Sequence, residues 1–275
     1  MRTRMAALCA ACLAITIAGV AAAGDAIDAV AIYDAVAPSV GMVVTFDDER
    51  YPVESGAGFF VGSPDVFVTQ LHLFAGAASA SVKTADGSYV DVVGILGHDA
   101  ATDLVALRTE GSGVVPSELA ASRAKVGATV VLGGSVDGMA TAFGLGTVTD
   151  TLSDAAGNRF YALDAPVDAW NVGAPVLDTG GAVVGVAAHS ANGPVAITAQ
   201  AVDRLLSAEG DDATFGDAAA AADGAGLFGD LVNPARDLPS IDQFSERTPG
   251  EKAALLVALA LLVVGGYEVA TSIAP

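Results

Sequence analysis

Short apolar runs separated by glycine, aspartate and proline fill the first half of the chain, and this pattern predicts β-strands joined by tight turns. A short helix is expected at Asp25–Ala37, and Pro38 should end it. The strands predicted after it are Val40–Phe46, Gly56–Gly62, Val66–Thr69, Ser79–Thr84, Tyr89–Gly97 and Asp103–Arg108. Asp86-Gly87 is a hairpin turn signal between two of these runs. Their even spacing predicts a β-barrel.

A second series of strands follows a break over residues 109–128. It comprises Thr129–Gly134, Gly144–Thr151, Arg159–Asp164, Ala174–Asp178, Ala182–His189 and Pro194–Thr198. A helix at Ala199–Glu209 closes this series. We therefore expect an all-β fold with two β-rich halves, at residues 24–113 and 114–208.

The N-terminal segment has the composition of a secretory signal peptide. Arg2 and Arg4 precede an uncharged apolar run, Met5–Val20, and small residues follow up to Ala23. A basic start, an apolar centre and a small-residue cleavage site are the three parts of such a peptide. We predict that residues 1–23 are a signal peptide; an uncleaved membrane helix is the alternative.

The C-terminal part divides into two segments of different composition. Residues 209–247 are rich in alanine, glycine and aspartate without a hydrophobic period, which predicts an acidic flexible linker. Residues 248–275 open with Thr248 and Pro249, which suit a helix start, and contain an uncharged run, Ala253–Tyr267. A helix over this segment is long enough to cross a bilayer core of about 30 Å. We predict a C-terminal transmembrane anchor; a buried core helix is the alternative.

Composition and charge exclude several kinds of site. Both cysteines, Cys9 and Cys12, lie in the predicted signal peptide, so the mature chain would have no disulfide, thiol nucleophile or cysteine metal site. The formal net charge is -20 at pH 7, which disfavours binding to nucleic acid and to anionic lipid surfaces. The sequence contains no phosphate-binding loop, and we expect neither a cofactor nor a metal.

Histidine and aspartate residues supply the candidate chemistry. His72 directly follows a predicted strand, and Asp103 begins another. Three blocks, SGAGFFVGSPDVFVTQLHLFAGA, VVGILGHDAATDLVALR and LDAPVDAWNVGAPVLDTGGAVVGVAAHS, resemble in this order the three blocks of trypsin-like serine proteases of the HtrA type. The resemblance covers residues 30–206. It implies a trypsin-like double β-barrel, with the cleft between the barrels.

The resemblance also implies roles for individual residues. The mechanism needs a hydroxyl that attacks, an imidazole that accepts its proton and a carboxylate that orients the imidazole. His72 occupies the base position and Asp103 the orienting position. The family's nucleophile loop reads Gly-Asn-Ser-Gly-Gly-Pro, whereas this chain reads Trp170, Asn171, Val172, Gly173, Ala174 and Pro175.

This loop departs from the family pattern at three positions. Val172 stands where the family has serine, and a valine side chain cannot attack a carbonyl. Trp170 replaces the glycine whose N–H contributes to the oxyanion hole, and Ala174 replaces a second glycine. Asn171 and Gly173 match the pattern. The two changes beside Val172 argue against a single error in the sequence.

We therefore expect an exported, membrane-anchored homologue of serine proteases that binds a peptide or protein ligand without hydrolysing it. The alternative is an active serine endopeptidase with a different nucleophile, for which Ser190 and Thr179 are the nearest hydroxyl residues in sequence. A third possibility is a surface module with a structural role only. His98 is expected on a surface loop and His189 at the end of a strand. The sequence does not indicate an oligomeric state.

Overall fold

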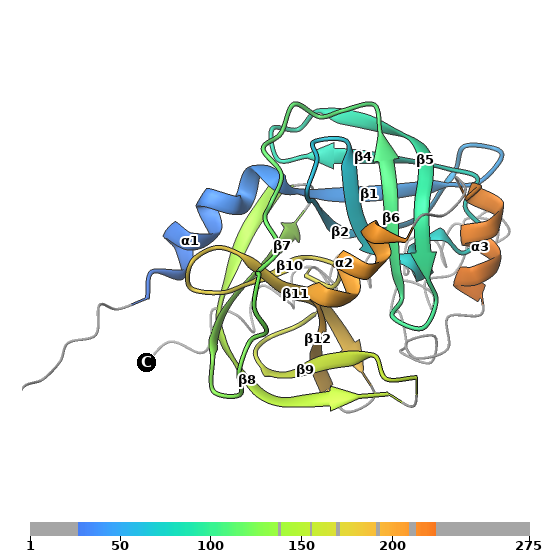
Figure 1. Ribbon diagram of the computed structural model, residues 1–275. Helices are drawn as coiled ribbons and strands as arrows, with labels where there is room; N and C mark the ends of the chain where they lie inside the picture. The colour runs from blue at the N-terminus through green and yellow to red at the C-terminus, as the bar shows by residue number, and fades with distance from the viewer. Residues whose placement is uncertain are drawn as a thin grey trace, which may run out of the picture.

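A computed structural model of the chain describes residues 27–136, 139–154, 156–168, 171–190, 193–208 and 213–223. The predicted signal peptide, the predicted membrane anchor and Trp170 lie outside these residues. The described residues form two β-barrels, with helices packed on their outer surfaces (Figure 1).

The first barrel closes in the order β1-β2-β3-β6-β5-β4, and its neighbouring strands are antiparallel. Its strands are β1 (Val40–Phe46), β2 (Pro52–Phe60), β3 (Val66–Gln70), β4 (Ser79–Thr84), β5 (Tyr89–Asp99) and β6 (Leu104–Thr109). The predicted bounds of β1 and β4 are confirmed. β2 starts earlier and β5 ends later than predicted, because their extra residues pair with the neighbouring strands.

The second barrel closes in the order β10-β11-β12-β9-β8-β7. Its strands are β7 (Thr129–Val136), β8 (Met139–Ser153), β9 (Arg159–Asp164), β10 (Pro175–Leu177), β11 (Val183–Ser190) and β12 (Gly193–Thr198). The predicted bounds of β9 are confirmed. β8 begins before the predicted strand because its first residues pair with the end of β7 in a hairpin.

Three α-helices and two 3₁₀ turns complete the described fold. They are α1 (Ala29–Val36), η1 (Ala37–Ser39), η2 (Leu71–Phe74), α2 (Ala199–Ser207) and α3 (Phe215–Asp223). The prediction of a flexible linker is wrong for the part that α3 occupies, because this helix buries apolar residues against the first barrel. None of the helices in the described ranges has the length and apolar character needed to cross a bilayer.

A shared apolar cluster holds the two barrels together. It joins first-barrel and second-barrel residues that are all buried, among them Val40, Phe59, Val68, Val131, Leu177 and Val186. Burial of apolar side chains is the main driving force for such packing. The two barrels therefore present their facing loops in a fixed arrangement.

Tyr33 on α1 fastens this helix to the second barrel. Its side chain is fully buried, and its hydroxyl donates a hydrogen bond to the carbonyl of Gly134 over 3.0 Å. Burial raises the pKa of Tyr33 far above its ordinary value, so the hydroxyl remains a neutral donor. A Cβ atom at Gly133 would collide with the Tyr33 ring, so a glycine at this position makes room for the contact.

Candidate functional site

The first barrel supplies a hydrogen-bonded histidine and aspartate. His72 lies in η2, directly after β3, and Asp103 lies directly before β6, which is the neighbour of β3. The backbone N–H of His72 donates to Oδ1 of Asp103 over 2.8 Å, and Nδ1 of the ring lies 2.6 Å from Oδ2. One carboxylate therefore fixes both the backbone and the ring of His72.

Hydrogen bonds on both sides brace Asp103. Its side chain is 1% exposed, and its φ of 54° lies in the left-handed region, which aspartate tolerates better than most residues. Its carbonyl accepts a hydrogen bond from the N–H of Leu71 over 3.0 Å. In the preceding turn, the hydroxyl of Thr102 donates to Asp99 over 2.8 Å. These contacts direct the Asp103 carboxylate toward η2.

The His72 ring presents its other nitrogen to solvent. Because Nδ1 faces Asp103, Nε2 lies on the opposite edge of the ring. The His72 side chain is 31% exposed, whereas Asp103 is buried beneath it. In the described part of the chain, the hydrogen bonds of the His72 ring go to Asp103 alone. The pair can therefore accept a proton from solvent or from a ligand, but no described hydroxyl is positioned as its partner.

The loop that leads into β10 is closed by its own hydrogen bonds. Asn171 is fully buried. Its Oδ1 accepts from the N–H of Asp168 over 2.8 Å, and its Nδ2 donates to the carbonyl of Pro166 over 2.8 Å. A buried amide with both ends satisfied holds a turn in one conformation. The sequence does not predict this clamp, although an asparagine three residues after Asp168 is typical of a side chain that bonds back to a turn.

Val172 has its backbone donor engaged within the same loop. Its N–H donates to the carbonyl of Asp168 over 3.1 Å, which is the geometry of one helical turn. Its side chain is partly buried and packs against the apolar cluster of the second barrel. The position predicted for the nucleophile thus carries a hydrocarbon side chain, and its N–H bonds to the protein itself.

Gly173 brings this loop against the first barrel. Its φ of 89° is one that glycine adopts without strain. A Cβ atom at Gly173 would collide with the carbonyl oxygen of Ala57 in β2 and would lie 3.5 Å from Oγ1 of Thr69 in β3. Since Thr69 comes three residues before His72, the loop reaches the end of β3, the strand that leads into the turn with His72. Ala174, which follows Gly173, is fully buried.

The remaining residues singled out from the sequence lie elsewhere. The prediction of a surface loop for His98 is wrong: it lies in β5 opposite Val105, because β5 continues to pair with β6. Its Nδ1 is buried and has no hydrogen-bond partner among the described residues. His189 lies near the end of β11, as predicted. The hydroxyl of Ser190 donates to the carbonyl of Gly193 over 3.0 Å, and Thr179 lies in the turn between β10 and β11.

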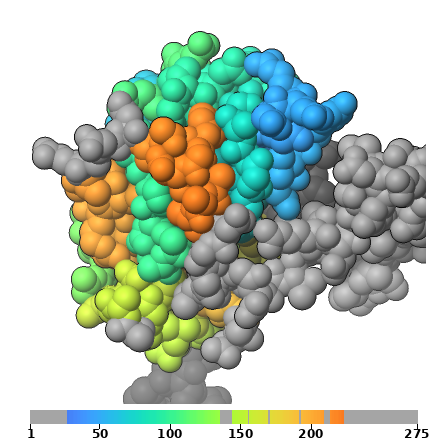
Figure 2. All heavy atoms as spheres, turned by 90° about the vertical axis from the view of Figure 1, so that its right-hand side faces the viewer, coloured from blue at the N-terminus to red at the C-terminus, as the bar shows by residue number. Residues whose placement is uncertain are grey.

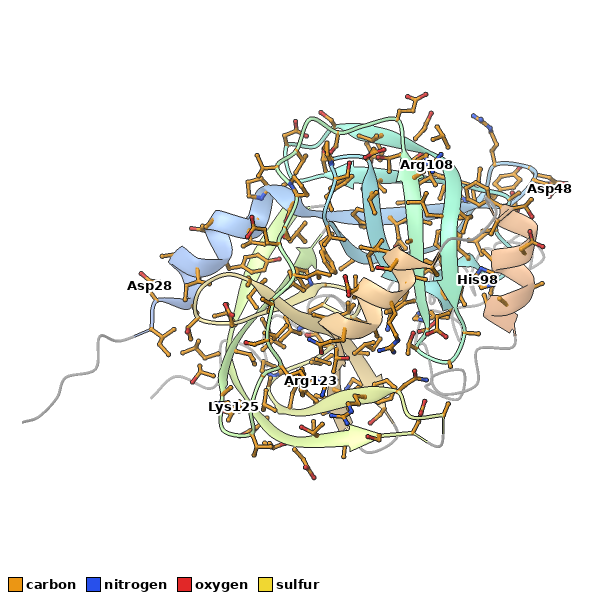
Figure 3. The ribbon with its side chains drawn as sticks, viewed as in Figure 1. Asp28, Asp48, His98, Arg108, Arg123 and Lys125 are labelled. Carbon is orange, nitrogen blue, oxygen red and sulfur yellow. The ribbon has the colours of Figure 1, made fainter. Side chains whose placement is uncertain are left out.

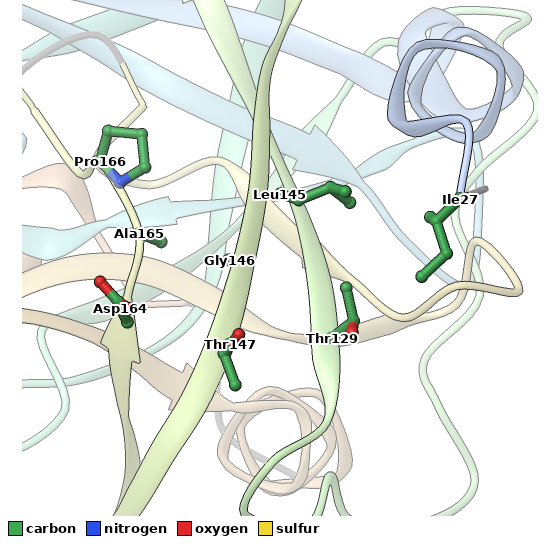
Figure 4. A pocket seen from close by; sticks show the side chains of 8 residues that line it. All are labelled: Ile27, Thr129, Leu145, Gly146, Thr147, Asp164, Ala165 and Pro166. Atoms are coloured by element: carbon green, nitrogen blue, oxygen red, sulfur yellow. The ribbon is translucent and has the colours of Figure 1, made fainter. Parts of the chain in front are cut away.

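A separate hollow of about 690 Å³ lies between the start of α1 and strands β7, β8 and β9 (Figure 4). Its lining includes Ile27, Leu145, Thr147 and Pro166, and it contains neither His72 nor Asp103. We assign no chemistry to this hollow, because Asp164 is its one ionisable lining residue. Among the described residues, no group of three or more histidine, aspartate or glutamate side chains could hold a metal ion.

Comparison with known proteins agrees with the predicted fold. Residues 56–186 match the family described as trypsin-like peptidase domain. The anti-sigma-I factor RsgI9 of Acetivibrio thermocellus is 32% identical over 157 residues, which cover 55% of this chain and 21% of that protein. A probable periplasmic serine endoprotease, DegP-like, of Bartonella henselae is 32% identical over 146 residues, which cover 49% of this chain and 28% of that protein.

A solved structure shows the same architecture. The active form of the Rv3671c protease from M. tuberculosis aligns with a TM-score of 0.58 and 26% identity, over 66% of this chain and 86% of that chain. The predicted double β-barrel is therefore confirmed. The chain spans less than a third of the length of the two curated relatives, so the likeness to them concerns the double barrel and not their whole chains.

Proposed function

The chain contains a trypsin-like peptidase domain related to HtrA-type serine proteases, and we propose that here the domain binds peptide or protein segments without hydrolysing them. One observation carries this proposal. The His72–Asp103 pair is formed, while Val172 stands at the nucleophile position with its N–H bonded to the carbonyl of Asp168.

The chemistry of peptide hydrolysis explains why these changes matter. Attack on a carbonyl needs a nucleophilic oxygen next to the base, and the oxyanion that forms needs free N–H donors. Removing the nucleophile costs on the order of 10⁶ in rate in a well-studied serine protease. Losing one oxyanion donor costs roughly 10² to 10³. A chain without either group would keep a cleft but not a measurable turnover.

The end of β11 supports a role in peptide binding. β10 pairs with β11 as far as Val186, and the next residue, Ala187, exchanges backbone hydrogen bonds with Gly173 and Ala174. Alternate residues of a strand direct their backbone groups to the same edge, so those of His189 point to the same edge as those of Ala187. No described residue pairs with His189 on that edge. An extended peptide added there would gain main-chain hydrogen bonds.

The curated relatives are compatible with a binding role. One of them is named a serine endoprotease, but the other, RsgI9, is named an anti-sigma factor. A domain of this kind therefore occurs in a protein named for something other than hydrolysis.

We further propose that the protein is exported and tethered to the membrane. Residues 1–23 would be the signal peptide and residues 248–275 the anchor, with an acidic spacer between α3 and the anchor. Expression in a bacterial host, followed by mass spectrometry of the N-terminus and alkaline carbonate extraction, tests both parts. We expect a mature N-terminus at Gly24 in a carbonate-resistant membrane fraction. An intact Met1 would contradict cleavage, and release by carbonate would contradict the anchor.

Hydrolysis is tested with the purified chain, a fluorophosphonate probe and casein, and with an active HtrA-type protease as the positive control. We expect no covalent labelling and no turnover above the His72→Ala variant. Labelling that His72→Ala abolishes would support the alternative, an active endopeptidase with a different nucleophile. Ser190→Ala and Thr179→Ala would then show which hydroxyl reacts.

Peptide binding is tested with a library of extended peptides. The chain has a single tryptophan, Trp170, so its fluorescence reports on the loop. His189→Pro removes the backbone donor at the edge of β11, whereas His189→Ala keeps it. Loss of one main-chain hydrogen bond should weaken binding by roughly five- to tenfold in the proline variant only. If no peptide binds the unmodified chain, a purely structural module becomes the better interpretation.

A further inference from the structure

α3 follows the second barrel in sequence but packs on the first. It lies against the strands of the first barrel, as the space-filling view shows (Figure 2). Just before it, Ala213 forms an isolated antiparallel bridge with Ile95 in β5. The helix contacts both β5 and η2, the turn that carries His72. The chain therefore returns, after leaving the second barrel, to the part of the first barrel that holds the candidate site.

One aromatic and three alanine residues of α3, Phe215, Ala218, Ala221 and Ala222, pack against the first barrel. Phe215, Ala218 and Ala222 follow the spacing of a helix face, and Ala218 and Ala222 are 0% and 7% exposed. The Phe215 ring lies 6.1 Å from that of Phe74, measured between ring centroids. The alanines let the helix approach closely, and the cluster that it joins contains Leu71 as well as Phe74.

A reciprocal cap fixes the start of α3. The N–H and the hydroxyl of Thr214 donate to the Asp217 carboxylate over 2.9 and 2.7 Å, and the N–H of Asp217 donates back to the hydroxyl over 3.2 Å. These hydrogen bonds from Thr214 lower the pKa of Asp217, and the charge of His98 lowers it further. His98 lies in β5, on the side of this strand that is next to α3 (Figure 3). The helix is thus a docked element with a defined start.

The cluster that α3 covers also contains the neighbours of the His72–Asp103 pair. Leu71 precedes His72, and its N–H donates to the carbonyl of Asp103 over 3.0 Å. Phe74 ends the turn in which His72 lies. Ala100, in the turn before Asp103, packs against the same cluster. Both short segments that carry the pair are therefore supported by the surface on which α3 rests.

We propose that α3 is a positioning element for His72 and Asp103, with Phe215 as the main positioning residue. While α3 is docked, η2 and the turn before Asp103 share one packed surface, which keeps the pair in register. When α3 leaves, Phe74 loses its aromatic neighbour and both turns gain freedom. The segment beyond the second barrel therefore controls the order of the site, whether or not the site binds peptides.

The three histidines of the chain allow this to be tested in one spectrum. In the full chain labelled with ¹⁵N at the histidine rings, His98 reports docking of α3, His72 reports the pair and His189, in the second barrel, is the internal control. Ala218→Asp places a carboxylate in the buried contact and forces release, and Phe215→Ala removes the aromatic contact. Ala220→Ser, at an exposed position of the same helix, is the matched control.

We expect both releasing variants to shift the His98 signals and to speed exchange of the His72 Nδ1 proton with water by roughly tenfold or more. Ala220→Ser should leave all three rings unchanged. A shifted His98 with unchanged His72 exchange would overturn the proposal, since α3 would then only cover an apolar patch. If Ala218→Asp also changes His189, that variant has lost the fold, and Phe215→Ala decides by the same criterion.

Discussion

His72 and Asp103 lie on two separate turns of the first barrel and bond across the gap between them, whereas Asn171 and Val172 both bond to Asp168 within a single loop of the second. The first arrangement exists only when β3 and β6 are paired. The second is set by residues next to each other in sequence. The geometry of the His72–Asp103 pair (the acid–base half of the site) therefore depends on the folding of the whole first barrel. The geometry around Val172 (the nucleophile half) depends only on its own loop.

The largest loss of stability is expected at Gly173, where the loop before β10 touches the first barrel. Gly173→Ala adds a Cβ atom that meets the backbone of Ala57 and forces an alanine to a φ of 89°. Strain and overpacking together should lower the free energy of unfolding by about 4 kcal/mol. Gly181→Ala is the matched control, because its φ is 87° but no backbone atom lies close. Equal losses in urea unfolding would mean that the contact with Ala57 contributes nothing.

Substitution of Asp103 tests the half that depends on the barrel. Asp103→Ala leaves the backbone N–H of His72 without its buried acceptor and should cost about 3 kcal/mol in urea unfolding. Asp103→Asn keeps an acceptor for this N–H and tolerates the left-handed φ, so it should cost about 1 kcal/mol. Similar losses for the two variants would show that the side-chain contact to His72 does not brace the turn.

Asn171→Ala tests the half that depends on its own loop. It removes two hydrogen bonds from a fully buried amide and should lower the free energy of unfolding by about 2 kcal/mol. Hydrogen exchange should quicken at Val172 while amides around His72 keep their protection. Faster exchange around His72 as well would show that the two halves are coupled.

As the pH falls, docking of α3 on the first barrel should weaken before the loop that Asn171 clamps is affected. The loop is clamped by a neutral amide, whereas α3 is capped by Asp217, whose pKa is lowered by hydrogen bonds from Thr214. A lowered pKa in the folded state stabilises the cap above the ordinary carboxyl value and loses that contribution as pH falls through the folded value. Docking of α3, followed by exchange of the Ala218 amide, should therefore persist at pH 5 and weaken below about pH 4. Weakening that is already complete at pH 5 would contradict this.

The smallest change in activity and stability is expected from Val172→Ser. The new hydroxyl would still lie beside a backbone N–H bonded to Asp168, and the changes at Trp170 and Ala174 would remain. Casein turnover should stay at the level of the unmodified chain, and loss of the apolar contact should cost about 1 kcal/mol. Turnover above the background of a Val172→Ala control would show that the loop opens readily.

The sequence predicts strands well where turn residues bound them. β1, β4 and β9 have the predicted limits for this reason. The composition around Thr214 indicates a linker, yet Thr214 and Asp217 have capping-box spacing, and Phe215, Ala218 and Ala222 form a helical stripe; α3 was therefore detectable. The Nδ1–Asp103 contact follows from the family resemblance. The direction of the Val172 N–H does not, because it depends on which carbonyl the folded loop brings within reach.

Tyr33 has a consequence for the order in which the molecule assembles. Its hydrogen bond partner, Gly134, lies 101 residues further along the chain. During synthesis α1 emerges early, but its docking surface does not exist until β7 has been made. The first barrel, whose strands end at Thr109, can close before α1 has docked. The earliest helix of the described chain is thus among the last elements to dock, and its docking adds Tyr33 to the apolar cluster that the two barrels share.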